Sequence, residues 1–214
     1  MRTKNAPDGR ESPTFIEAAR RAQIIAAAVD TLVELGYART TMAEIARRAS
    51  ISKSVISYYF DSKDALFEQV VETVYRAGAE TVVQRITPAS SAAAALRAWI
   101  RTDVEFIGSH PREVRAIAEI AFGMRAADGK PRWDAASSEW IVESVETLLR
   151  TGQESGEFRQ FPTRVMAVTL RAAIDRVSFE VMTRPGLDIE EYADELINIF
   201  ELATRNPDYK ASSG

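Results

Sequence analysis

Apolar residues recur along most of this chain at the three- and four-residue steps of an amphipathic α-helix. The first such stretch has its apolar positions on one helical face, at Ala18, Ala22, Ile25, Val29 and Leu32. Apolar and polar residues never alternate for long, so the half-buried β-strand is not a recurring element. The pattern predicts an all-α protein whose first helix spans about 14–35.

Two short helices are predicted to follow the first one. Thr41 and Glu44 have the spacing of a capping box, in which the hydroxyl accepts an amide hydrogen bond and the carboxylate reaches back. This box begins a helix over 42–49, and Ser52 is the N-cap of a second helix over 53–59. Such a succession is typical of a helix-turn-helix unit.

A long helix is predicted over 63–86, and prolines divide the remaining chain into helical segments. Each of these prolines is tolerated in the first turn of a helix but not in its interior. The segments are predicted near 89–108, 112–127, 132–154, 163–183 and 188–204.

The residue types needed for catalysis or metal binding are scarce. The chain has no Cys and one His, which excludes disulfides, thiol nucleophiles and Cys- or His-rich metal sites. It also lacks a phosphate-binding glycine loop and a nucleophile–base motif. We therefore expect no cofactor, no metal and no enzymatic activity.

The first twenty residues are polar, and no run of about 18 apolar residues occurs. We therefore expect a cytoplasmic protein without a membrane anchor. The net charge of −4 is unevenly distributed. Residues 1–60 hold nine Lys/Arg and six Asp/Glu, whereas the remainder holds eighteen and twenty-five. The excess of basic residues over 1–60, in a chain that is otherwise acidic, favours a nucleic-acid contact in this N-terminal region.

The predicted helix over 53–59 has an outer face suited to the major groove of DNA. Ser54, Ser57 and Tyr58 fall within an arc of about 100°, and Ile56 points the opposite way. At the edges of this arc, Lys53 can meet a phosphate or guanine, and Val55 can pack on a thymine methyl group.

Several short motifs in this region carry a family resemblance. They are Gly36-Tyr37, Thr40-Thr41-Met42, Ile45-Ala46, Ser52-Lys53, Tyr59-Phe60 and Ser62-Lys63-Asp64-Ala65-Leu66. Over about residues 15–70, the chain resembles the N-terminal domain of the TetR family of transcriptional regulators. The resemblance implies a homodimer with an N-terminal DNA-binding domain and a C-terminal all-α domain that dimerises and binds a small effector.

The resemblance divides the chain into a helix-turn-helix DNA-binding domain (13–62) and a connector helix with an effector and dimerisation domain (63–206). The polar, Gly-, Pro- and Ser-bearing composition of the ends predicts flexible tails over 1–12 and 207–214. It implies DNA contacts at positions that match the family motif. These are Thr41, Ser52, Lys53, Ser54, Val55, Ser57, Tyr58 and Lys63. Thr40 joins them as a phosphate contact, because it clusters with Thr41 and Lys63 at helix N-termini.

Ser50 is a departure from the family pattern. Many relatives carry Gly there, so we expect Ser50 to hold a backbone conformation that Gly adopts more easily. Two further departures are Ser54, in place of a frequent Gly, and Ser57, in place of a frequent Tyr. These changes affect base preference and leave the fold unaffected.

The last two helices, about 163–183 and 188–204, are the predicted dimer interface, as the resemblance implies. The apolar positions of the first cover more than one stripe, and those of the second recur at near-heptad spacing. The middle helices concentrate aromatic and Met side chains that can line an effector pocket. The candidates are Trp99, Phe106, Phe122, Met124, Trp133, Trp140, Met166 and Phe179. The same pattern is also typical of a plain core.

Together with these patterns, the resemblance implies a TetR-like repressor that holds a palindromic operator as a homodimer. A small, mainly apolar or aromatic effector would release it. The alternative is a DNA-binding dimer without a small-molecule response, whose helical body serves as a scaffold for protein interactions.

Overall fold

The computed structural model describes residues 15–126, 128–130, 132 and 138–209. The described residues form nine α-helices and no strand. These helices are α1 (Phe15–Leu35), α2 (Met42–Arg48), α3 (Lys53–Tyr59), α4 (Lys63–Ile86), α5 (Ala92–Ser109), α6 (Pro111–Gly123), α7 (Glu139–Glu154), α8 (Thr163–Thr183) and α9 (Ile189–Thr204). The prediction of an all-α fold is confirmed.

The largest departures from the predicted helix bounds lie around α6 and α7. The helix predicted over 112–127 ends at Gly123, and the one predicted over 132–154 begins at Glu139. The helix predicted from 89 begins at Ala92, because the Ser91 hydroxyl accepts a hydrogen bond from the Ala94 amide and caps α5 there. The predicted tail 1–12 lies outside the described residues.

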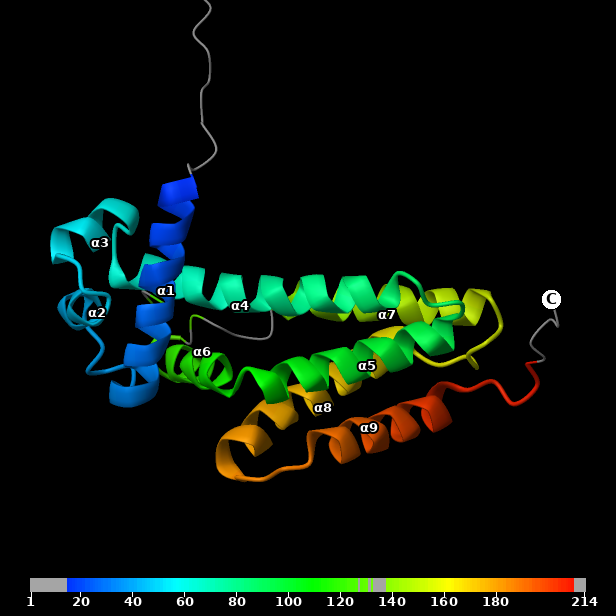
Figure 1. Cartoon of the computed structure of the whole chain (residues 1–214). Coiled ribbons are helices and arrows are strands. Elements are labelled where there is room, and N and C mark those ends of the chain that lie inside the picture. The colour runs from blue at the N-terminus through cyan, green and yellow to red at the C-terminus, as the bar shows by residue number, and fades with distance from the viewer. Residues whose placement is uncertain (1–14, 127, 131, 133–137, 210–214) are drawn as a thin grey trace, which may run out of the picture.

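The apolar stripe predicted for the first helix is wrong over its first half. Ala18 and Ala22 are exposed, and the buried face runs instead through Ile24, Ala28 and Leu32. The cause is tertiary, since the first turns of α1 extend beyond α4 (Figure 1).

A first buried core is formed by residues of α1, α2, α3 and α4 at one end of the molecule (Figure 1). Ile56 and Phe60, which are 0% and 3% exposed, anchor α3 to this core. Ile120 and Met124 also belong to it, so α6 and the residue that follows it complete the helix-turn-helix end.

A second core is formed by α5, α7, α8 and α9 with the later part of α4. Because α4 has 24 residues, it contributes to both cores and runs from one end of the molecule to the other (Figure 1). No helix in the described part of the chain is long and apolar enough to cross a membrane.

The turn between α7 and α8 links the end of α7 to the start of α5. The Phe158 amide donates to the Gly152 carbonyl (2.9 Å), and a Cβ on Gly152 would lie 2.1 Å from the Phe158 ring. Glu157 in the same turn accepts hydrogen bonds from the amides of Ala92 and Ala93, at 3.1 and 3.0 Å. This carboxylate therefore caps α5 from a distant part of the chain.

Candidate DNA interface and ligand pocket

The outer face of α3 is the first candidate site. Its N-cap Ser52 accepts a hydrogen bond from the Val55 amide (3.4 Å), and Ile56 is turned into the core. The side chains left exposed on the other side are Lys53, Ser54, Ser57 and Tyr58, with Ser52 next to them and Val55 half-buried. Among the described residues, none forms an ion pair with Lys53. The helix therefore presents one cation and several hydroxyl groups to the solvent.

Thr41 begins α2 as predicted, while the second half of the predicted capping box is different. The Thr41 hydroxyl accepts a hydrogen bond from the Glu44 amide (3.2 Å). The Glu44 carboxylate pairs with Arg47 in the next turn of the helix instead of reaching back. Because of this pairing, Arg47 is not a free cation at the surface.

The predicted phosphate contact of Thr40 is corrected by its position. Thr40 is fully buried, and its hydroxyl donates to the Gly36 carbonyl at 2.8 Å. This bond satisfies a carbonyl at the C-terminus of α1, where the helix leaves its last carbonyls without partners. The Thr40 side chain therefore stabilises the turn and is turned away from the surface.

Lys63 is also used within the fold. Its Nζ donates to the Tyr37 carbonyl (3.0 Å) and lies 4.2 Å from the centroid of the Tyr37 ring. Partial burial lowers the pKa of Lys63. The ammonium group thus holds the turn after α1 against the start of α4, and its phosphate contact stays a prediction.

Ser50 has the backbone conformation expected for it. Its φ is 55°, and it is the one non-glycine residue with a positive φ among those the structure describes. This left-handed conformation turns the chain between α2 and α3 and so orients the outer face of α3.

The second candidate site is a cavity of about 480 Å³ between α4, α5, α6, α7 and α8. Five of the predicted residues line it, namely Trp99, Phe106, Phe122, Trp140 and Phe179. Met124 and Met166 do not, because Met124 is buried in the first core and Met166 packs against the second. Trp133 lies outside the described residues.

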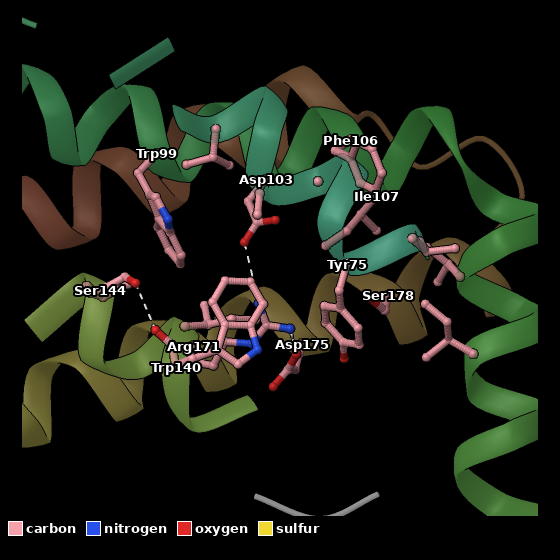
Figure 2. Close-up of a pocket in the computed structure, with 18 of the residues that line it drawn as sticks. Tyr75, Trp99, Asp103, Phe106, Ile107, Trp140, Ser144, Arg171, Asp175 and Ser178 are labelled. Carbon is pink, nitrogen blue, oxygen red and sulfur yellow. Dashed lines mark hydrogen bonds and ion pairs between the residues drawn. The ribbon is translucent and has the colours of Figure 1, made fainter. Parts of the chain in front are cut away.

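The cavity contains a polar cluster that the sequence interpretation missed. Arg171 of α8 pairs with Asp175 at 2.5 Å, as its spacing indicates, but also with Asp103 of α5 at 3.5 Å. Figure 2 shows these three side chains meeting at the cavity, close to Trp99 and Tyr75. The available signal was the position of Asp103, which lies on the apolar face of α5 between Trp99 and Ile107.

The cluster is set in an apolar environment. Only 11% of the Arg171 side chain and 16% of the Asp103 side chain are exposed. Burial raises the pKa of the Asp103 carboxyl, although the neighbouring Arg171 acts in the opposite direction. Burial also raises the pKa of the Tyr75 hydroxyl. The cavity therefore has apolar walls and one charged, poorly hydrated patch.

Comparison with known proteins finds a family match for the region that contains the candidate DNA interface on α3. Residues 24–70 match the model of the family described as bacterial regulatory proteins, tetR family. The HTH-type transcriptional regulator BetI of Paraburkholderia xenovorans is 47% identical over 57 residues, which are 27% of this chain and 29% of that protein. The helix-turn-helix region of this chain is therefore similar to that of the TetR family.

A second curated relative, BetI of Burkholderia thailandensis, is 37% identical to this chain over 87 residues. That match covers 40% of the chain and 45% of the relative, so the aligned stretches span less than half of either BetI protein. Both relatives are described as HTH-type transcriptional regulators.

The similarity to solved structures extends beyond residues 24–70 to most of the chain. The fatty acid degradation regulator FadR of Bacillus halodurans is 19% identical with a TM-score of 0.74, covering 89% of this chain and 96% of that one. The MbdR regulator of Azoarcus sp. CIB is 26% identical with a TM-score of 0.68, covering 83% and 95%. At such low identity, FadR shows that the two chains share a fold.

Proposed function

We propose that the chain is a transcriptional repressor that binds a palindromic operator as a homodimer and releases it when a small effector occupies the cavity. The observation that carries this proposal is the exposed hydroxyl and cationic face of α3 on a TetR-family helix-turn-helix unit. The cavity lies in the same molecule, beside the helix that connects both ends.

The DNA contact follows from the chemistry of the α3 face. Lys53 supplies the charge for a phosphate or a guanine edge, and the hydroxyls of Ser54 and Ser57 can bond bases or phosphates. Tyr58 has 76% of its surface exposed, so its hydroxyl can reach a phosphate. Its ring is braced edge-on against Tyr59, with 5.0 Å between the ring centroids.

The dimer contact is supported by exposed apolar side chains on α8 and α9. These are Val165, Val168 and Phe179 on α8 and Ile199 and Leu202 on α9, each between 45% and 62% exposed. The α8 positions recur at helical spacing, so they form one face. A two-fold axis through such a face pairs two identical helix-turn-helix units, which fits a palindromic site.

Two helices connect the cavity with the DNA-binding end. Residues of α4 and α6 line the cavity, and α6 also contacts the helix-turn-helix unit directly. The Tyr37 amide donates to Glu119 of α6 (3.0 Å), and Arg112 of α6 pairs with Asp30 of α1 (2.5 Å). A ligand that fits better when α4 and α6 are displaced would shift the spacing of the two α3 helices and release DNA.

A small ligand with a mainly apolar or aromatic surface suits this cavity. Its walls combine Trp99, Phe106, Trp140 and Phe179 with aliphatic residues of α4 and α6. A dimer that responds to no small molecule stays the alternative. A ligand-dependent increase in the unfolding temperature separates the two, because a ligand that binds only the folded state stabilises it.

The test is to select genomic fragments that bind the purified protein and to footprint the selected site. We expect two protected half-sites related by two-fold symmetry, about one helical turn apart. Protection of a single half-site would contradict binding as a dimer.

The dimer itself is tested with Val168→Glu, which places a charge on the exposed face of α8. We expect a monomer in sedimentation velocity and weak operator binding, because a buried unpaired charge opposes association. Gln84→Glu introduces the same side chain on an exposed part of α4 and should leave the dimer intact. A dimeric Val168→Glu protein would show that α8 does not form the interface.

A further inference from the structure

The charged patch in the cavity carries a net negative charge when its groups are ionised. Asp103, Arg171 and Asp175 are the charged residues among those that line the cavity in the described part of the chain. Two carboxylates therefore face one guanidinium. In the low dielectric of a mainly apolar cavity, this unbalanced charge acts strongly on an incoming ligand.

The carboxylate of Asp103 retains unused capacity to accept hydrogen bonds. Oδ2 lies 3.5 Å from Nη1 of Arg171, and no described residue donates a hydrogen bond to either carboxylate oxygen. An ionised carboxylate has about four acceptor positions, so a donor on the ligand would satisfy it. In Figure 2 the Asp103 carboxylate points into the space bounded by Trp99, Trp140 and Arg171.

The guanidinium of Arg171 is poorly placed to receive an anion. One terminal nitrogen pairs with Asp103 and the other with Asp175, while Nε is covered and has no hydrogen-bond partner among the described residues. An anionic ligand would have to displace one of these carboxylates and would add a second excess negative charge. A cationic ligand would instead balance the charge of the patch.

The surroundings of Asp103 suit an ammonium group on an apolar body. The rings of Trp99 and Trp140 lie around the patch and offer faces that attract cations. The Tyr75 hydroxyl, which bonds to no described residue, and Ser178 line the same region and can accept further N–H donors. Burial raises the pKa of Asp103, and a bound cation would relieve the cost of ionising this carboxyl.

We propose that the cavity binds an amphiphilic amine, with its protonated nitrogen at Asp103 and its apolar part between the aromatic side chains of α5, α7 and α8. This proposal rests on the proposed effector role of the cavity and names the chemical class of its ligand. Charge balance at Asp103 is the feature that selects an amine over a neutral or acidic compound of the same shape.

The test compares three probes with one skeleton: phenylhexylamine, phenylhexanol and phenylhexanoate, each with its polar group and its phenyl ring at opposite ends. Calorimetric titration of the full-length protein measures the dissociation constant of each. We expect the amine to bind at least about tenfold more tightly than the other two, as expected for one well-placed charge pair. Equal binding of all three, stronger binding of the alcohol or acid, or binding of none would overturn the proposal.

Asp103→Asn should remove the preference for the amine, whereas Asp103→Glu should retain it. Asp175→Asn removes the negative charge of the more exposed carboxylate in the patch and should reduce the preference for the amine. This second variant keeps the proposal testable if Asp103→Asn does not fold. The matched control is Asp194→Asn on α9, whose carboxylate pairs with Arg101 away from the cavity. An unchanged preference in folded Asp103→Asn would contradict the proposal.

Operator binding is measured on the same preparation. Tight operator binding without an amine preference would overturn the ligand class and leave the proposed DNA function standing. An amine preference in a protein that binds no operator would instead support the ligand class and contradict the proposed DNA-binding function.

Discussion

Ser57 and Tyr58 are the side chains whose hydroxyl groups should matter most for DNA binding. Both are exposed on α3, and neither supports the core. We expect Ser57→Ala and Tyr58→Phe each to weaken operator binding by about 1–2 kcal/mol, because each removes one hydrogen bond. Fluorescence anisotropy with operator DNA measures the effect, and Thr147→Ala, at an exposed position of α7, is the control. Unchanged affinity in both variants would contradict the assignment of α3 as the recognition helix.

Ser50 holds a conformation that costs free energy for any residue with a Cβ. Replacing it by Gly should raise the free energy of unfolding by about 0.5–1 kcal/mol, since relief of the left-handed strain exceeds the entropy cost of Gly. Urea unfolding measures this change. Ser50→Ala retains the Cβ and should give no increase, so a gain in both variants would contradict the explanation.

At the scale of the element, α5 depends on a carboxylate from the turn after α7. Burial alone raises the pKa of Glu157, but the hydrogen bonds from Ala93, Ala92, Ser155 and Ser91 together outweigh it and hold the pKa below the usual 4.5. The lowered pKa means that this stabilisation is present above pH 4.5 and is lost as the pH falls through the folded-state pKa.

Glu157→Gln should therefore cost about 1 kcal/mol of stability near neutral pH and progressively less in acid. Urea unfolding of both proteins over a pH series measures the difference between them. Glu154→Gln, in the last turn of α7, is the control, because the Glu154 side chain bonds to no described residue. A difference for Glu157→Gln that is constant over the pH series would contradict the capping role.

The contact between α6 and the DNA-binding end depends on a glycine. A Cβ on Gly123 would lie 2.1 to 2.7 Å from atoms of the Tyr37 side chain. Gly123→Ala should therefore destabilise the protein by about 1–3 kcal/mol, as overpacking does. Combining it with Tyr37→Ala should cost less than the sum of the two single variants, as measured by thermal unfolding. Additive costs would show that α6 and this turn are not in such close contact.

At the scale of the whole molecule, the features predicted correctly are those determined by neighbouring residues. The bounds of α3, α4 and α8 agree with prediction because N-caps, prolines and helical periodicity act within a few residues. The inward position of Ile56 and the left-handed Ser50 have equally local causes.

The features that were missed depend on tertiary contacts. Thr40 and Lys63 bond to carbonyls of Gly36 and Tyr37, and those bonds depend on how the turn after α1 packs on α4. The pairing of Asp103 with Arg171 joins α5 to α8, and helical spacing gives no information about such a contact. Met124 carries no local sign that it is buried at the DNA-binding end instead of lining the cavity.

The most direct test of the proposed function is fluorescence anisotropy of the full-length protein on the selected operator and on a scrambled duplex, at two salt concentrations. We expect tight binding that prefers the operator and weakens with salt, because Lys53 and its neighbours replace counterions on the phosphates. Equal, weak binding to both duplexes would contradict the proposal that this chain is a sequence-specific regulator.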